Sequence, residues 1–202
     1  MTLLHVDSSI LGPNSVSRTL SAEIVERMRR QTPELEIVYR DLGGNPMDHL
    51  TGAHLAAGQG AAPESEALGR DIDAGAAVLR EFLVADTVVI GAPMYNFGVP
   101  SQLKSWIDRL AIAGQTFHYT EKGPEGLCAG KQVIVASSRG NVYGAGTPNA
   151  ALDHQETVLR TVFGFFGITD VTVIRAEGVW FGDDAREKAI EGARGEIASL
   201  TA

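Results

Sequence analysis

The sequence has almost no cysteine, and its histidines are not grouped. Cys128 is the only cysteine among 202 residues, so neither an intramolecular disulfide nor a cysteine-rich metal cluster can form. A chain without disulfides fits a reducing compartment, and we expect a cytoplasmic protein. Histidine ligands of a metal usually recur at short, regular spacings. The five histidines lack such spacings, so no metal site is predicted: His5, His49, His54, His118 and His154.

Basic charge is also scarce. Seventeen lysines and arginines stand against 25 acidic residues, which gives a formal net charge of −8. Nucleic acids and anionic membrane surfaces attract basic protein faces, so neither is expected as a partner. Any anionic ligand must therefore be held by a local arrangement of donors and not by the field of the whole protein.

Export signals, membrane spans and common nucleotide-binding motifs are missing as well. Met1–Asp7 lacks the basic residues and the long apolar run of a signal peptide. The best membrane candidate, Phe82–Pro100, contains Gly91 and Pro93, so it is predicted to be a buried strand that runs into a loop. No G-x-G-x-x-G follows the first predicted strand, and no G-x-x-x-x-G-K-[ST] occurs, which argues against a P-loop NTPase.

What the sequence does contain is a regular alternation of strands and helices. Short apolar runs predict five strands, at Leu3–Asp7, Leu35–Tyr39, Thr87–Gly91, Gln132–Ala136 and Val171–Ala176. Apolar residues at helical spacing predict five helices, at Ser17–Arg30, Glu64–Val84, Pro100–Ile112, Asn149–Phe166 and Asp183–Leu200. Two further segments interrupt this pattern, a loop with a short helix at Gly43–Pro63 and a hairpin at Thr116–Cys128.

This alternation predicts one α/β domain that covers residues 1–202. Helices would cover both faces of a five-stranded parallel sheet, in three layers. Five strands fit the flavodoxin-like order 2-1-3-4-5, in which ligands bind beyond the carboxyl ends of strands 1 and 3. The loops after the first, third and fourth strands are therefore the candidates for a site.

These three candidate loops are poor in charge. We call them the first, second and third site loops: Ser8–Arg18, Ala92–Phe97 and Ser137–Gly144. The wider segments that contain them (residues 1–20, 87–103 and 132–150) carry three charged side chains, which are Asp7, Arg18 and Arg139. Buried strands explain only part of this scarcity, and the remainder fits a neutral binding surface.

The first site loop leaves a strand and opens a helix. The start of a helix offers unpaired N–H groups and a positive dipole end. Ser9, Ser15 and Ser17 add hydroxyl donors, and Gly12 allows a tight turn. The loop would therefore suit one terminal phosphate. The alternative is that Asn14 or Ser15 only caps the helix.

The second site loop brings together two aromatic rings, an amide and a thioether, in the run from Met94 to Phe97. A flat heteroaromatic ring needs an apolar face with polar groups at its edge, which this loop can supply. In the third site loop, Gly140 and Asn141 permit positive φ and a close approach of the backbone. Arg139 is predicted to stabilise negative charge on a bound ring. The alternatives are a core turn for the second loop and a surface arginine for Arg139.

Several motifs resemble the FMN-dependent NADH-azoreductases, a family of flavodoxin-like NAD(P)H:quinone oxidoreductases. The resemblance runs from Leu3 to the last helix in the order and spacing of the family. Its motifs are Ser8-Ser9-Ile10-Leu11, Ser15-Val16-Ser17, Ala92-Pro93-Met94-Tyr95-Asn96-Phe97, Phe117-His118-Tyr119-Thr120, Gly123-Pro124-Glu125-Gly126-Leu127, Ser138-Arg139-Gly140, Gly164-Phe165-Phe166-Gly167-Ile168 and Ala176-Glu177-Gly178.

The resemblance implies bound FMN and NADH as co-substrate, with a quinone or an azo compound as the acceptor. It also implies a homodimer with its flavin sites at the subunit interface. The phosphate would be held by Ser9, Ser15, Val16 and Ser17. The isoalloxazine ring would be lined by Met94, Tyr95, Asn96, Phe97, Ser138, Arg139, Gly140 and Asn141. The chain departs from the family at Val16, Asn141 and Tyr143, where Gln, Gly and His are frequent, so a contact of Tyr143 with flavin or substrate is left open.

A flavin enzyme of this kind works by a ping-pong cycle, in which the cofactor carries the chemistry and no protein nucleophile is needed. Phe117 and Tyr119 are expected beside the acceptor. The main alternative is a flavin-bearing electron carrier that acts through protein partners and has no NADH activity of its own. A serine esterase with Ser8 as nucleophile lacks an evident base. A phosphoacceptor receiver lacks an acidic residue after Ile90.

Overall fold

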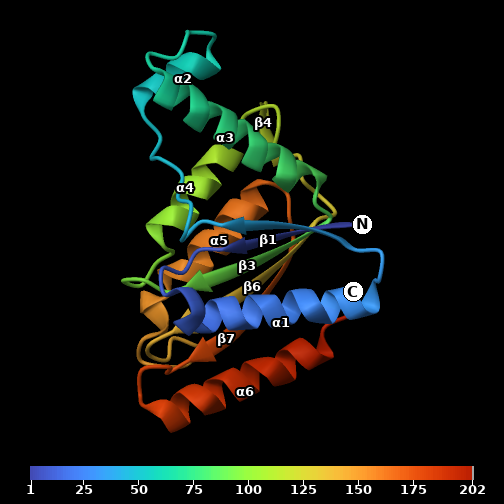
Figure 1. The fold of residues 1–202 in the computed structure, drawn as a ribbon, viewed down its shortest axis with the longest axis vertical. Coiled ribbons are helices and arrows are strands. Elements are labelled where there is room, and N and C mark those ends of the chain that lie inside the picture. Colours follow the sequence, from blue (N-terminus) through green and yellow to red (C-terminus); the bar gives the residue numbers. More distant parts are fainter. Residues whose placement is uncertain (202) are drawn as a thin grey trace.

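The protein, described here by a computed structural model over residues 1–201, contains a five-stranded parallel sheet (Figure 1). The strand order is β2-β1-β3-β6-β7, which is the predicted order 2-1-3-4-5 when only the strands of this sheet are counted. The register places Leu3 opposite both Ile37 and Thr87, and Thr87 opposite Gln132. The strands are β1 (Thr2–Asp7), β2 (Glu36–Asp41), β3 (Thr87–Pro93), β6 (Gln132–Arg139) and β7 (Asp170–Glu177).

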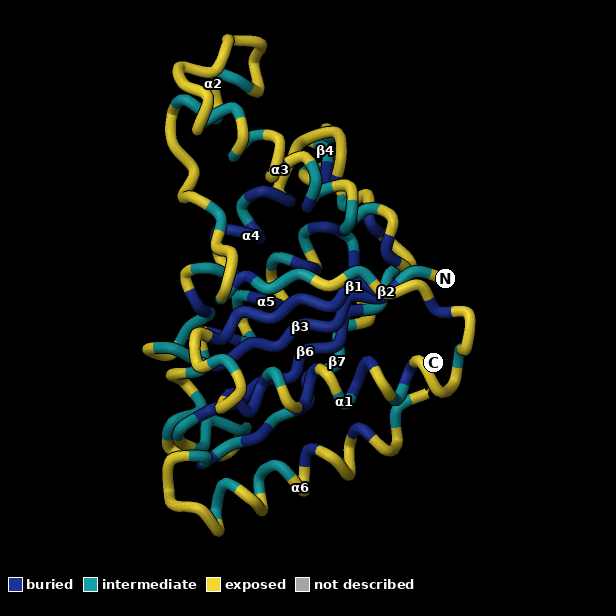
Figure 2. Tube along the Cα trace, in the orientation of Figure 1, coloured by how far each residue is buried: buried dark blue, intermediate teal, exposed yellow. Residues whose placement is uncertain are grey.

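Helices cover the two faces of the sheet (Figure 1). The longer helices are α1 (Val16–Gln31), α3 (Glu66–Val84), α4 (Ser101–Leu110), α5 (His154–Phe165) and α6 (Asp183–Ser199). On one face α1 and α6 pack against the sheet, and Ile24 and Ile197 join Val89 in that core. On the other face α3, α4 and α5 contribute Phe82, Trp106 and Phe163 to a second core. The expected three layers are therefore present, and the middle strands between them are buried (Figure 2).

The two segments that interrupt the strand–helix alternation also have the predicted secondary structure. The loop after β2 contains the short helix α2 (Gly52–Gly58), and the polar excursion after α4 is a hairpin of β4 (Phe117–Thr120) and β5 (Gly123–Gly126). The segment from 82 to 100 ends α3, forms β3 and enters a loop. Within residues 1–201, no helix has the length and apolarity needed to cross a bilayer.

Two expectations about local structure are wrong. Ser137–Arg139 is not a loop but the end of β6, because these residues pair in register with β7 as far as Glu177. The first turn of the predicted helix at 149–166 is instead a short 3₁₀ turn, η2 (Ala150–Leu152), because Asp153 caps α5 by accepting the N–H of Glu156 at 3.0 Å.

The hairpin of β4 and β5 lies away from the carboxyl ends of the parallel strands. A Cβ atom added at Gly126 would lie 2.0 Å from the nitrogen of Gly167, so β5 packs on the connection from α5 into the start of β7. Within this chain, Phe117 and Tyr119 therefore lie apart from the site loops, and their place beside the acceptor stays a prediction.

Candidate functional site

The three site loops meet at one cavity beyond the carboxyl ends of β1, β3 and β6. These strands are neighbours in the sheet, so the residues that follow them converge at the switch point of the topology. A fourth segment, which joins β7 to α6, completes the wall. The cavity is lined by Ser9, Leu11, Asn14, Ser15, Val16, Pro93, Met94, Tyr95, Ser138, Gly140, Val179, Trp180 and Arg186.

The first site loop turns and starts α1 as predicted. Gly12 has a φ of +53° and begins the 3₁₀ turn η1 (Gly12–Asn14). Ser15 caps α1, since its Oγ accepts the N–H of Arg18 at 3.3 Å. The same Oγ lies 3.1 Å from the Oγ of Ser17, and Ser9 Oγ lies 3.4 Å from the Tyr95 hydroxyl. The capping role left open for Ser15 is present, and it places three buried serine hydroxyls at the start of the helix.

A partly buried polar cluster behind the first site loop fixes its backbone. Arg18 donates to the carbonyl oxygen of Ser9 from Nε at 3.1 Å and from Nη2 at 2.8 Å. Its Nη2 also lies 2.5 Å from Asp41 Oδ1, and this hydrogen bond holds the pKa of Asp41 below its usual range. A Cβ atom added at Gly43 would lie 2.3 Å from the Ser9 oxygen, so the loop also passes close to the β2–α2 connection.

The cluster behind the first loop includes the end of β1. Asp7 is buried, and its carboxylate accepts the Ser21 hydroxyl at 2.7 Å and the Tyr39 hydroxyl at 3.1 Å. Burial and the charge of Asp7 raise the pKa of Tyr39 to about 12, so this phenol stays a donor at neutral pH. The Asp7 carboxylate is thus directed at internal partners, and Gly91 of the neighbouring strand leaves it room.

The second site loop is a tight hairpin turn with strained backbone. Tyr95 and Gly98 exchange both backbone hydrogen bonds, at 3.1 and 3.0 Å. Asn96 and Phe97 between them have φ values of 48° and 70°, the geometry of a type I′ turn. Asparagine tolerates this region, whereas phenylalanine rarely adopts it, and such strain is concentrated at functional sites. Both side chains are exposed, so the turn presents an amide and an aromatic ring to the outside.

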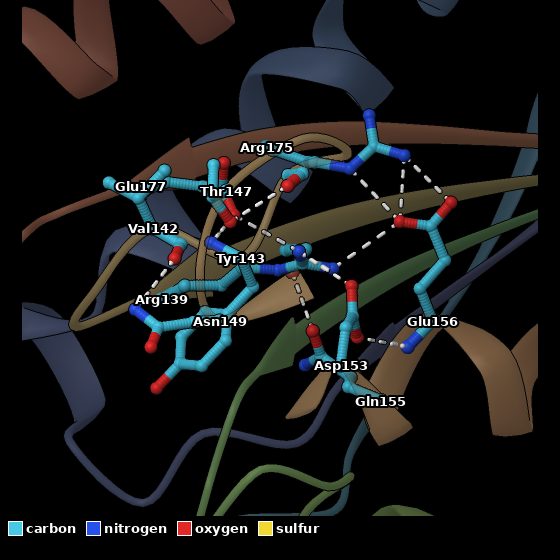
Figure 3. Close-up of polar contacts among 12 residues, drawn as sticks. Arg139, Val142, Tyr143, Thr147, Asn149, Asp153, Gln155, Glu156, Arg175 and Glu177 are labelled. Atoms are coloured by element: carbon cyan, nitrogen blue, oxygen red, sulfur yellow. Dashed lines mark hydrogen bonds and ion pairs between the residues drawn. The ribbon is translucent and has the colours of Figure 1, made fainter. Parts of the chain in front are cut away.

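The third site loop differs from the prediction, because Arg139 is an internal cation. Its side chain is 1% exposed, and Nη1 lies 2.8 Å from Asp153 and 3.1 Å from Glu177. Nη2 lies 3.4 Å from Glu156, and Nε donates to Ser137 Oγ at 2.9 Å (Figure 3). The expectation that this guanidinium stabilises charge on a bound ring is wrong, since three carboxylates already surround it. The Arg139 side chain joins the ends of β6 and β7 to the start of α5.

The glycine of the third site loop also has a different reason from the expected one. Neither Gly140 nor Asn141 has a positive φ, although other described glycines do. Instead, a Cβ atom at Gly140 would lie 2.8 Å from the indole ring of Trp180, so the glycine makes room for this side chain. Asn141 is exposed, and its Oδ1 accepts the N–H of Val142 at 2.7 Å. Tyr143 packs edge-on against Phe97, with 6.3 Å between ring centroids.

Sequence reasoning missed the wall formed by Val179, Trp180 and Arg186. These residues follow β7, which does not border the switch point, so its loop was not among the candidates. One signal was present: Trp180 and Phe181 are adjacent aromatics at the carboxyl end of a strand, and both are exposed, Trp180 at 86%. Large exposed aromatics at a ligand edge are uncommon without a binding role.

A parallel sheet of order 2-1-3-4-5 with a cavity at its switch point defines the flavodoxin-like class of α/β proteins. The chain belongs to the flavodoxin-like fold family, whose model matches residues 1–200. It is 61% identical over 202 residues, the whole of both chains, to a protein of Bradyrhizobium diazoefficiens named FMN-dependent NADH:quinone oxidoreductase 2. It is 56% identical, again over the whole of both chains, to the FMN-dependent NADH:quinone oxidoreductase of a Methylorubrum extorquens strain.

Solved structures agree with this family. The crystal structure of an azoreductase from Bacillus anthracis superposes with a TM-score of 0.86 at 28% identity. The match covers 98% of this chain and 97% of the other. An NAD(P)H:quinone oxidoreductase from Methanothermobacter marburgensis shares the fold, with a TM-score of 0.70 at 18% identity over 98% of this chain and 95% of the other.

Proposed function

We propose that the protein is an FMN-dependent NADH:quinone oxidoreductase that also reduces azo compounds by a ping-pong cycle. The observation that carries this proposal is the cavity, which combines phosphate donors at the start of α1 with the exposed aromatic turn of the second site loop. The names of relatives at 56–61% identity support an enzyme. They do not support the alternative, an electron carrier without NADH activity.

The residues at the cavity fit FMN by the chemistry of their donors. A phosphate accepts hydrogen bonds, and three serine hydroxyls stand beside the first-turn N–H groups of α1, which no helical carbonyl reaches. We assign the phosphate to Ser9, Ser15, Val16 and Ser17. Val16 contributes through its backbone N–H, so the apolar side chain at this position does not weaken the assignment.

We assign the isoalloxazine ring to the second site loop and the end of β6. The apolar and polar groups of this region are Met94, Tyr95, Asn96, Phe97, Ser138, Arg139, Gly140 and Asn141. Arg139 contributes through its backbone only, because its guanidinium is held inside by carboxylates. Met94 is fixed in place by the hydrogen bond from its N–H to the Ser138 carbonyl at 2.8 Å, which joins the two loops.

The protein's part in the reaction is placement. FMN, when bound, accepts hydride from NADH and passes the reducing equivalents to the quinone or azo acceptor. The Arg18 and Arg139 clusters hold the first and third site loops in position, and the strained turn at Asn96-Phe97 directly follows the lining residues Met94 and Tyr95. None of these residues is required as a nucleophile.

The cofactor assignment is tested on the purified protein, which is expected to be yellow and to release FMN on denaturation. A colourless protein that fails to bind added FMN would contradict the proposal. Replacing Ser9, Ser15 and Ser17 together by alanine should weaken FMN binding, whereas Ser101→Ala, on the exposed start of α4, should not. NADH consumption that depends on an added quinone separates the enzyme from the electron carrier.

We further propose a cytoplasmic, single-domain protein that forms a homodimer through the edge of the sheet that carries the cavity. Exposed apolar side chains follow β1, β3 and β7 there, and patches of this kind mark interfaces. They are Ile10, Leu11, Phe97, Trp180 and Phe181. Sedimentation equilibrium should give twice the mass of one chain, and a monomer at micromolar concentration would contradict this assembly.

A further inference from the structure

The segment that joins β7 to α6 is fixed against the third site loop. The N–H groups of Gly178, Val179 and Trp180 donate to the carbonyls of Asn141, Arg139 and Gly140, at 3.1, 3.1 and 3.3 Å. These bonds join the two segments beyond the point where the pairing of β6 with β7 ends. The segment is therefore part of the framework of the cavity and places the start of α6 beside it.

Arg186, in the first turns of α6, reaches the start of α1 across this framework. Its Nη2 donates to the carbonyl oxygen of Asn14 at 3.1 Å, and Asn14 directly precedes the cap residue Ser15. Arg186 is half-buried and lines the same cavity as Ser9 and Ser15. It is the one cationic side chain among the residues that line this cavity.

The guanidinium of Arg186 differs from those of Arg18 and Arg139 in its partners. Arg18 and Arg139 each contact carboxylates, whereas Arg186 makes no ion pair with any carboxylate in residues 1–201. Its Asn14 contact uses one nitrogen. Arginine carries five N–H donors in a planar fork, so several donors and a full positive charge stay available beside the phosphate donors.

We infer that Arg186 contacts the phosphate of FMN and supplies its counter-charge. The inference rests on the proposed function, because it takes the FMN phosphate to lie at the start of α1. The phosphate donors Ser9, Ser15 and Ser17 are neutral, the buried Asp7 carboxylate lies behind the first site loop, and the protein as a whole is acidic. A phosphate monoester there gains a charge-assisted hydrogen bond from the one cationic side chain that lines the cavity.

The test compares FMN with riboflavin, which has the same ring and ribityl chain but no phosphate. Dissociation constants of both ligands are measured by calorimetry on the apoprotein. Arg186→Gln should weaken FMN binding about ten- to hundredfold, the usual worth of a hydrogen bond to a charged group. Riboflavin binding should change by less than about twofold, because riboflavin has no phosphate for Arg186 to contact.

Two matched variants control for charge and for damage to the cavity. Lys188→Gln removes the same charge from an exposed position of α6, and FMN affinity should stay within about twofold. Trp180→Ala removes part of the cavity wall but no charge. It should change the affinities for FMN and for riboflavin by the same factor. An equal loss of both ligands in Arg186→Gln would overturn the inference, as would a loss of FMN affinity in Lys188→Gln as large as in Arg186→Gln.

A second source of phosphate is the pyrophosphate of NADH. If Arg186→Gln leaves the FMN dissociation constant unchanged and raises the KM for NADH, the contact belongs to the co-substrate and the inference is wrong. Failure of the proposed function gives a different result, since the wild-type apoprotein would then bind no FMN at all.

Discussion

The first and third site loops are each held by an inward-pointing arginine, whereas the second is held by backbone hydrogen bonds around a strained turn. Arg18 and Arg139 are 16% and 1% exposed, and both point into the protein. The second loop instead closes through two backbone hydrogen bonds around Asn96 and Phe97. A charged residue in a loop can therefore stabilise the fold and not bind the ligand. The residues that line the cavity are neutral apart from Arg186, which comes from α6.

The two arginines also differ from each other. Arg18 gives two hydrogen bonds to the Ser9 carbonyl and so fixes the path of the loop itself. Arg139 gives its donors to side chains and ties together β6, β7 and α5. Loss of Arg18 should therefore affect the ligand loop more directly, and loss of Arg139 should affect the whole fold more.

The largest effect is expected for Arg139→Ala. It leaves the partly buried carboxylates of Asp153 and Glu177 without their buried cation, and breaking a buried ion pair costs about 3–5 kcal/mol. Urea unfolding of the apoprotein measures the loss. Arg160→Ala removes a half-exposed partner of Glu156 in the same cluster and should cost less than about 1 kcal/mol. Equal losses in the two variants would show that Arg139 is not the central cation.

Arg18→Ala should cost less stability, about 2 kcal/mol, because it leaves the Ser9 carbonyl without its donors and removes a charged partner of Asp41. It should weaken FMN binding as well, since the loop loses its fixed path. Arg30→Ala, on the same helix but in an exposed pair with Glu26, is the control. Unchanged FMN affinity in Arg18→Ala would contradict the role assigned to this cluster.

Most of the fold follows from local patterns. Apolar runs and helical spacing place all five strands of the parallel sheet, and the strand–helix alternation then limits the topology to few orders. The end of β6 was missed because Ser137–Arg139 is polar. Its polar groups find buried partners only after folding, such as Gln155, whose Oε1 accepts the Ser137 hydroxyl at 2.7 Å. A single sequence does not reveal partners of that kind.

The site was predictable in its location but not in the direction of its side chains. The topology places the three site loops at the carboxyl ends of β1, β3 and β6. The structure brings Ser9, Tyr95 and Ser138 from these loops to one cavity. The orientation of Arg139 depends on Asp153 and Glu177, which lie 14 and 38 residues away in sequence. The position of Trp180 in the cavity wall depends on Gly140, which follows β6 and leaves room for the indole ring. Both are long-range packing relations, which spacing along the chain does not encode.

Acid should weaken the protein through the carboxylates of these clusters. Arg18 lowers the pKa of Asp41, so the folded state favours the ionised form. The stability from this ion pair is present above the unfolded pKa of about 4 and is lost as pH falls through the lower folded value. The pKa of Glu156 is lowered as well. Burial raises this pKa, but the hydrogen bonds and charges of Arg175 and Arg160 together outweigh it, so Glu156 also loses its stabilising contribution in acid.

Asp41→Asn should therefore lower stability at pH 7 and make its decline between pH 5 and pH 3 shallower. Urea midpoints across this range measure both effects. Asp108→Asn is the control. It breaks the Lys104–Asp108 pair, which is more exposed than the Arg18–Asp41 pair, and should leave the pH profile close to that of the wild type. A profile of Asp41→Asn parallel to the wild type would show that the Arg18 pair does not contribute to acid sensitivity.

The smallest effect on stability is expected in the second site loop, from Phe97→Gly. Glycine relieves a positive φ that costs phenylalanine about 1 kcal/mol, but it also increases the freedom of the unfolded chain and loses the edge contact with Tyr143. These terms oppose each other, so the free energy of unfolding should change by less than about 1 kcal/mol. FMN binding should nevertheless weaken, because the exposed ring is one of the groups assigned to the isoalloxazine. A stability loss above 2 kcal/mol with unchanged FMN affinity would reverse this assignment: Phe97 would then support the fold, and the strained turn would be scaffold like the two arginines.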